Sequence, residues 1–358
     1  MTNNELEDFY YSSNKVAKRM GVTTEEILKQ AAAWSRLGYS SAEQATKMAQ
    51  LSSQFASISP GMSTDEAQEG LVSIIKAWGL DVDEVEREVM DNINHLGNRF
   101  AESNIDLVNG MKRSAAALAA TGTTYQDAFA LFTGAQEVVQ NAEVTGRALR
   151  SISMRMHGYS ENSEDGLMEV DEELKNITGD LIDLTKTAEH SQGVSIFKEG
   201  SSTEFKSLVE YFGEINKIWD EMSQVQQNSF LDKAFGKNQA QAGAAIVQNY
   251  EAIAEAIKVM EDAAGSSDRE MSIIMDSLDY KLNRLSETGT SVAQNLFKRD
   301  DMATVVDGLT SVMSVIDKLT SKLGLFGSIG LGAGIFAGVK NIGKNMRVHG
   351  FQIICFMF

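Results

Sequence analysis

The stretch GMSTDE at residues 61–66 contains the signals that end one helix and begin the next. Gly61 is the residue type that most easily adopts the left-handed conformation found just after a helix. Ser63 can cap the following helix, and Glu66 can return the hydrogen bond three residues later, as in a capping box. The stretch therefore predicts a tight corner between two helices.

The same order of residue types recurs around four other glycines in the first half of the chain. Each has a glycine, then Ser, Thr or Asp, and then Glu or Gln three residues after that. The spacing of the five glycines is too irregular for a solenoid repeat. The corners predict helical hairpins, and we assign no chemistry to their acidic residues. The other four corners are Gly21–Glu26, Gly38–Glu43, Gly79–Glu84 and Gly122–Gln126.

The low proline content also favours helices. The chain has 358 residues and one proline, Pro60, where average usage of about 5% would give about eighteen. Between the corners, apolar residues recur three or four positions apart, as on the buried face of a helix. We therefore predict an all-α fold, with helical hairpins first and long coiled-coil-like helices after them. Such runs include Val82, Val85, Val89, Ile93, Leu96 and Phe100, and later Ala242, Ile246, Tyr250, Ile253, Ile257 and Met260.

Composition divides the chain into five predicted segments. Seven acids and no Lys or Arg lie between residues 161 and 173, which is typical of a solvated linker. This stretch lacks the spacing of a calcium-binding loop. Val194, Ile196 and the glycine at 200 favour a short β-hairpin near 193–202. The segments are a hairpin region (1–158), an acidic linker with this hairpin (159–203), long amphipathic and heptad helices (204–322), a Gly-rich apolar segment (323–340) and an atypical tail (341–358).

The apolar spacing tightens to 3.5 residues from Met271 onward. Steps of four and three alternate as far as Leu296, with Gly289 as the one gap, and a second run extends from Met302 to Leu323. Sustained spacing of this kind predicts a coiled-coil seam. The partner helix can belong to the same chain or to another copy, and the sequence leaves both alternatives open.

The segment after Lys322 has the features of a membrane-inserting sequence. Seventeen residues without a charge precede Lys340, which is the lower limit for crossing a hydrocarbon core of about 30 Å. Its glycines form two overlapping small-xxx-small steps, which let helices approach closely in lipid. The alternative is a flexible, partly buried hinge. The residues that we expect to enter a bilayer are Leu323, Gly330, Gly334, Ile335, Phe336, Gly338 and Val339.

The sequence contains no arrangement that indicates an enzyme. The four histidines form no metal-binding motif, and there is no nucleophile elbow and no phosphate-binding loop. His157 lies next to a predicted helix end. We therefore expect no enzymatic activity, no cofactor and no metal. The net charge of −18 repels phosphate backbones, so we expect no specific nucleic-acid binding.

Several stretches in a fixed order resemble the core region of phage tail tape measure proteins. A heptad region and a Gly-rich apolar segment follow them in the order found in that family. The resemblance extends over roughly residues 10–340, and the ordered series carries it because no single motif is diagnostic. The stretches are 36–45, 109–129, 193–197 with 211–219, and 235–246.

The resemblance implies a structural virion component. Tape measure proteins lie in the lumen of the tail tube, set tail length during assembly and help the genome to cross the host inner membrane. The expected partners are the tail tube protein, tail tip or initiator proteins, assembly chaperones, further copies of the chain and, transiently, the host membrane. The expected locations are the virion, the host cytoplasm during assembly and the host inner membrane at infection.

Two further expectations follow from the sequence. The chain is shorter than most tape measure proteins, and its apolar end at 350–358 is typical of a reading frame cut short, so we expect a fragment or a truncated prophage copy. The alternatives to a tail protein are a pore-forming helical protein and a coiled-coil scaffold unrelated to tails. Neighbouring genes that encode tail proteins would favour the interpretation as a tail protein.

Overall fold

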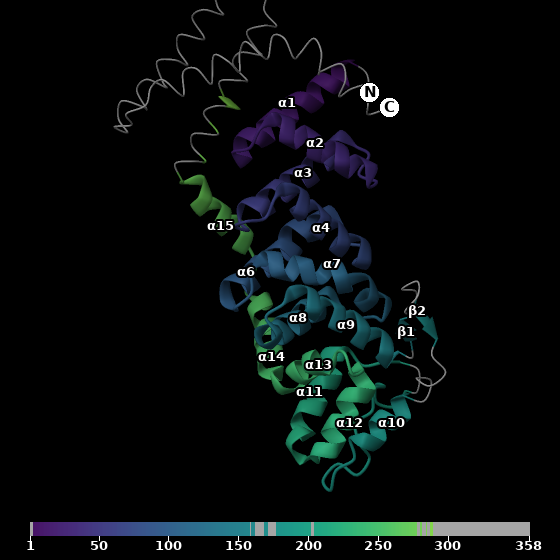
Figure 1. The fold of residues 1–358 in the computed structure, drawn as a ribbon. Helices are drawn as coiled ribbons and strands as arrows, with labels where there is room; N and C mark the ends of the chain where they lie inside the picture. The colour runs from purple at the N-terminus through teal and green to yellow at the C-terminus, as the bar shows by residue number, and fades with distance from the viewer. Residues whose placement is uncertain are drawn as a thin grey trace, which may run out of the picture. The chain divides into compact units, whose positions relative to one another are not determined.

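The computed structural model describes residues 3–157, 159–161, 168–170, 177–201 and 204–277, together with residues 280, 284, 287 and 288 (Figure 1). The fold is all-α, which confirms the prediction. The chain divides into two compact units. The first unit contains Met1–Gln54 and Ser272–Phe358, and the second contains Phe55–Met271. Nearly all of the predicted heptad seam lies outside the described residues.

The first unit begins with a pair of antiparallel helices. Helix α1 (Asn3–Met20) packs against α2 (Thr24–Arg36), and α3 (Ala42–Ser57) follows and continues into the second unit. The indole N–H of Trp34 donates a hydrogen bond to the Ser52 hydroxyl at 2.9 Å. Small residues let the helices approach closely. The buried core of this unit is Phe9, Ala17, Ile27, Ala31, Ala45 and Ala49.

The second unit consists of helices and one pair of short strands. Its first helices are α4 (Thr64–Trp78), α5 (Val82–Glu84), the π-helix η1 (Val85–Val89), α6 (Met90–Arg99), α7 (Asn104–Ala120), α8 (Tyr125–Val139) and α9 (Ala142–Met156). Strands β1 (Tyr159–Glu161) and β2 (Met168–Val170) follow. The remaining helices are α10 (Ile177–Leu184), α11 (Leu208–Ile218), the 3-10 helix η2 (Trp219–Glu221), α12 (Gln224–Phe235), α13 (Ala240–Gln248) and α14 (Tyr250–Glu261). Helix α15 (Ser266–Met275) begins in this unit and extends beyond its last residue, Met271.

Helix α7 lies at the centre of this unit. It packs between α4 and α9, and α8 covers it from another side (Figure 1). Helix α14 runs against α6 and α8, although α14 comes more than a hundred residues later in the chain. A cluster of buried aromatic rings joins α11 to α12. Its members are Tyr211, Phe212, Trp219, Phe230 and Phe235.

The five predicted corners are confirmed. Their glycines all have positive φ angles: 68° at 21, 109° at 38, 89° at 61, 69° at 79 and 78° at 122. Thr23, Ser63 and Asp81 cap the following helices as expected.

At the other two corners the cap lies one residue later than predicted. Ser41 replaces Ser40, and Thr124 replaces Thr123. The N–H of Thr123 bonds to the Leu118 carbonyl and still closes the end of α7, so the next residue becomes the cap.

Three segments differ from the expected local structure. The hairpin predicted near 193–202 is a single antiparallel bridge between Phe197 and Phe205, and the two strands lie instead in the acidic segment, with Tyr159 opposite Val170. The run from Ala242 to Met260 is broken at Asn249 into α13 and α14. The run that starts at Val82 contains the π-turn η1, which inserts an extra residue into the helical path.

Candidate functional site

The residues predicted to enter a membrane lie outside the described part of the chain. These are Leu323, Gly330, Gly334, Ile335, Phe336, Gly338 and Val339. Among the helices that the structure describes, none has the length and apolar character needed to cross a bilayer. Membrane insertion of the 323–340 segment therefore stays a prediction.

Titratable side chains do not gather into a metal site in the described residues. No group of three or more His, Cys, Asp or Glu side chains there could hold a metal ion. His157 caps the end of α9 and lies near the Phe205 ring, with its Nδ1 2.7 Å from the Ser153 carbonyl oxygen. Burial lowers the pKa of His157. This is a histidine at a helix end, as the sequence indicates.

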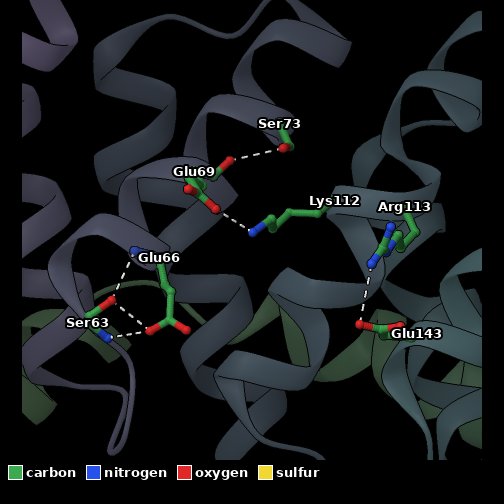
Figure 2. Close-up of polar contacts among 7 residues, drawn as sticks. All are labelled: Ser63, Glu66, Glu69, Ser73, Lys112, Arg113 and Glu143. Atoms are coloured by element: carbon green, nitrogen blue, oxygen red, sulfur yellow. Dashed lines mark hydrogen bonds and ion pairs between the residues drawn. The ribbon is translucent and has the colours of Figure 1, made fainter.

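The outer faces of α4, α7 and α9 form a charged surface that we take as the candidate functional site (Figure 2). Lys112 on α7 reaches Glu69 on α4, with Nζ 2.6 Å from Oε2. The adjacent Arg113 reaches Glu143 on α9, with Nη2 3.3 Å from Oε1. The two ion pairs extend from α7 to two different helices and so connect three helices. All four side chains are partly exposed, so each pair contributes less than about 1 kcal/mol.

The close approach of α7 and α9 positions Arg113 beside Glu143. A Cβ atom added at Gly146 would lie 2.5 Å from the carbonyl oxygen of Gly110 and 3.0 Å from the Cβ of Arg113. The two helix backbones are thus in direct contact. Sequence reasoning did not single out Gly146, because a glycine inside a helix does not reveal which helix lies opposite.

A capping box fixes the start of α4 next to this surface. The Ser63 N–H donates to Glu66 Oε2 at 2.8 Å, and the Glu66 N–H donates to the Ser63 hydroxyl at 3.2 Å (Figure 2). These bonds lower the pKa of Glu66 below its usual value. One turn later, the Ser73 hydroxyl donates to the Glu69 carbonyl at 2.9 Å. The charged surface therefore lies on helices with defined ends.

A buried polar junction connects α6 to the start of α15. Asp91 is 4% exposed. Its carboxylate accepts hydrogen bonds from the N–H of Gly265 at 2.5 Å, from the N–H of Ser267 at 2.8 Å and from the Ser267 hydroxyl. A carboxylate at a helix N-terminus satisfies free N–H groups and interacts favourably with the helix dipole. Asp91 thus acts as a cap supplied from another helix.

Buried amides extend the junction. Asn94 donates to the Ser266 hydroxyl at 2.8 Å, and Asn104 donates to the Ser59 hydroxyl at 3.0 Å. The Asn104 side-chain amide also donates to the side-chain oxygen Oδ1 of Asn94 at 3.4 Å. The junction therefore joins the corner before α4, helix α6, the start of α7 and the start of α15. The sequence offered no signal for it, because its members are far apart along the chain.

Glu102 is an acidic side chain buried in the loop between α6 and α7. Thr133 donates to its Oε1 at 2.6 Å, and its buried Oε2 has no hydrogen-bond partner among the residues that the structure describes. Burial is the main cause that raises the pKa of Glu102 to about 8; the Thr133 hydrogen bond opposes it, and the negative charges of Asp106 and Glu137 add to it. Glu102 therefore carries a proton at neutral pH.

The comparison with known families finds one match. A family model described as phage-related minor tail protein matches residues 12–236, which is more than half of the chain. The matched region contains the whole charged surface and the α6 side of the polar junction, whereas α15 lies after it. No solved structure matches the chain.

Proposed function

The chain belongs to the phage-related minor tail protein family, and from this premise we propose that it acts in the tail as a tape measure protein. Membership in the family gives the protein a structural role in the phage tail, among other tail proteins. The family match, over a region whose described residues are mostly helical, is the observation that carries the proposal.

The physical properties of the chain support a role as a ruler. A helix rises about 1.5 Å per residue, so an extended helical chain converts residue number into length. The net charge of −18 disfavours adhesion to DNA passing through the same tube. The proposed partners are the tail tube protein, tip or initiator proteins, assembly chaperones and further copies of the chain. The surface on α4, α7 and α9 offers them both signs of charge.

The tape measure proposal is tested by changing the length of the chain in a phage that assembles tails with it. Deleting 28 residues, or four heptads, from the 271–323 region shortens an extended helix by about 42 Å. Tail lengths measured by electron microscopy should fall by a similar amount. A matched variant that replaces the 28 residues with an unrelated helical sequence should restore the length. Tails of unchanged length in the deletion would contradict the proposal.

We also propose that the 323–340 segment enters the host inner membrane during genome ejection. The segment has seventeen uncharged residues and six glycines. Adding the full chain to anionic liposomes should release an entrapped dye, and Gly334→Lys should abolish the release because a charge in the hydrocarbon core is costly. A matched Gly122→Lys variant should leave it intact. No release by the original chain would favour the coiled-coil scaffold, and equal release by both variants would contradict insertion through this segment.

A further inference from the structure

A cleft of about 340 Å³ opens in the second unit beside the π-turn η1. It lies between α6, the start of α8 and the end of α14. π-Turns within α-helices occur frequently at functional sites, and pockets of this size can hold a few ligand atoms or one side chain. Its lining residues are Arg87, Glu88, Asn92, Gln126, Ile257, Met260, Glu261 and Ala264.

Asn92 is the polar group that indicates a ligand. It is 93% buried, being 7% exposed, and it lines the cleft. Its side-chain amide makes no hydrogen bond to any residue in the part of the chain that the structure describes. The amide atoms of Asn92 are not among the fully buried polar atoms without a partner in the described residues, so they remain accessible from the cleft that Asn92 lines. An amide has one acceptor and two donors, which together match the N–H and C=O of a peptide backbone.

The charged residues around the cleft favour the binding of a positively charged group. Glu88 and Glu261 supply two carboxylates. Glu88 accepts a hydrogen bond from the Tyr125 hydroxyl at 2.5 Å through Oε2. Arg87 is the one cation among the lining residues that the structure describes, and its guanidinium pairs with Asp83 at 3.9 Å and donates to the Asp83 carbonyl. The carboxylates therefore outnumber the cation.

The apolar part of the cleft suits the stem of a long side chain. Ile257, Met260 and Ala264 provide aliphatic surface next to the two carboxylates. Lysine and arginine bury their methylene stems along apolar surface while the charged end meets polar groups. We propose that the cleft binds an extended segment of a partner protein through a lysine or arginine side chain, with Asn92 pairing with the backbone of that segment.

The site also adjoins the polar junction at α15. Asn92 follows Asp91, and Ala264 precedes Gly265, whose N–H bonds to Asp91. A segment bound in the cleft therefore contacts both sides of the α6–α15 connection. The proposed site goes beyond the tape measure role and does not depend on it.

The test uses the full chain with ¹³C-labelled Ile and Met methyl groups, so that Ile257 and Met260 report from inside the cleft. The probe is a capped pentapeptide with a central lysine between alanines. The lysine and arginine peptides should shift both signals saturably. A norleucine peptide should bind at least fivefold more weakly, and a glutamate peptide should cause no shift. Equal binding of the lysine and norleucine peptides, or no shift with lysine, would overturn the proposal.

Two variants with matched controls locate the binding. Asn92→Ala should weaken binding of the lysine peptide at least fivefold, whereas Asn109→Ala, on the exposed side of α7, should not. Glu261→Gln should weaken binding severalfold and reduce its salt dependence, whereas Glu251→Gln, on the same helix but outside the lining, should not. The Glu261 side chain is exposed, so its replacement keeps the fold. Unchanged affinity in both test variants would assign the methyl shifts to another site.

Discussion

The carboxylate of Asp91 accepts a hydrogen bond from the backbone N–H of Ser267 at 2.8 Å, across 176 residues of sequence. Asp91 lies on α6, and Ser267 lies in the first turn of α15. Helix α15 buries only Ser266, Ser267 and Met271, so little apolar packing accompanies this polar contact. Asp91 therefore holds the start of α15 largely through hydrogen bonds.

Replacing Asp91 by Ala should loosen the start of α15 while the rest of the second unit stays folded. Hydrogen bonds to a charged group contribute about 1.5–3 kcal/mol each, and the variant leaves the N–H groups of Gly265 and Ser267 without their acceptor. Amide hydrogen exchange at residues 265–271 should accelerate at least tenfold. The control is Asp83→Ala, at an exposed position on α5. Equal loss of protection across α7 and α9 would indicate a general core role for Asp91.

Replacing Glu102 by Gln should change how stability depends on pH. Burial raises the pKa of Glu102 from its ordinary value of 4.5 to about 8, so the folded protein retains a proton that the unfolded chain releases. The stabilising effect of this proton is complete below pH 4.5 and is lost as pH rises to about 8. The difference between the two pKa values corresponds to at most about 5 kcal/mol in the free energy of unfolding.

The measurement for Glu102 is urea unfolding between pH 5 and pH 9. Glu102→Gln should be less sensitive to pH than the original chain, and relatively more stable at pH 9. Glu199→Gln, at an exposed position, is the control. If the free energy of unfolding depends on pH in the same way in both variants and in the original chain, the pKa of Glu102 does not change on folding.

The one-residue shift of two caps gives a direct test of the corner at Gly38. Ser41→Ala should destabilise the protein by about 1 kcal/mol, because the Ser41 hydroxyl accepts from the Gln44 N–H at 3.1 Å. Ser40→Ala is the matched control and should change stability by less than about 0.5 kcal/mol. Thermal unfolding followed by circular dichroism distinguishes them. A larger loss of stability in Ser40→Ala than in Ser41→Ala would indicate that Ser40 is the cap, as the sequence pattern predicts.

The crossing of α7 and α9 has no room for a side chain at Gly146. Gly146→Ala should lower the free energy of unfolding by about 1–3 kcal/mol, because its Cβ would lie 2.5 Å from the Gly110 carbonyl. Gly179→Ala is the control within a helix, since nothing lies within 4 Å of its added Cβ. That change should stabilise α10 by up to about 1 kcal/mol. Equal effects of the two variants in urea unfolding would contradict the close contact.

Local signals explain which features the sequence predicted. Corners such as the one at Gly61 depend on residues within six positions of one another, and the structure has all five. The shift from Thr123 to Thr124 was missed because hydrogen bonding at the end of α7 decides it. The break at Asn249 was missed because the apolar spacing continues through it.

The functional features depend on contacts that no short pattern contains. Asp91 lies on a helix with regular apolar spacing, and nothing near it in sequence indicates Ser267 as a partner. Asn92 differs from any surface asparagine only in its burial beside α14. The resemblance to tail proteins was found from ordered stretches, and the family match at 12–236 supports it at the level of a minor tail protein.

The distance between Asp91 and Ser267 along the chain also sets an order of events during synthesis. Ribosomes add about 5–20 residues per second, so about 9 to 35 seconds separate the appearance of the two residues, which are 176 positions apart. Until then the Asp91 carboxylate lacks the N–H groups of Gly265 and Ser267 as partners. The nascent second unit therefore reaches its final hydrogen bonding only after translation has passed the start of α15.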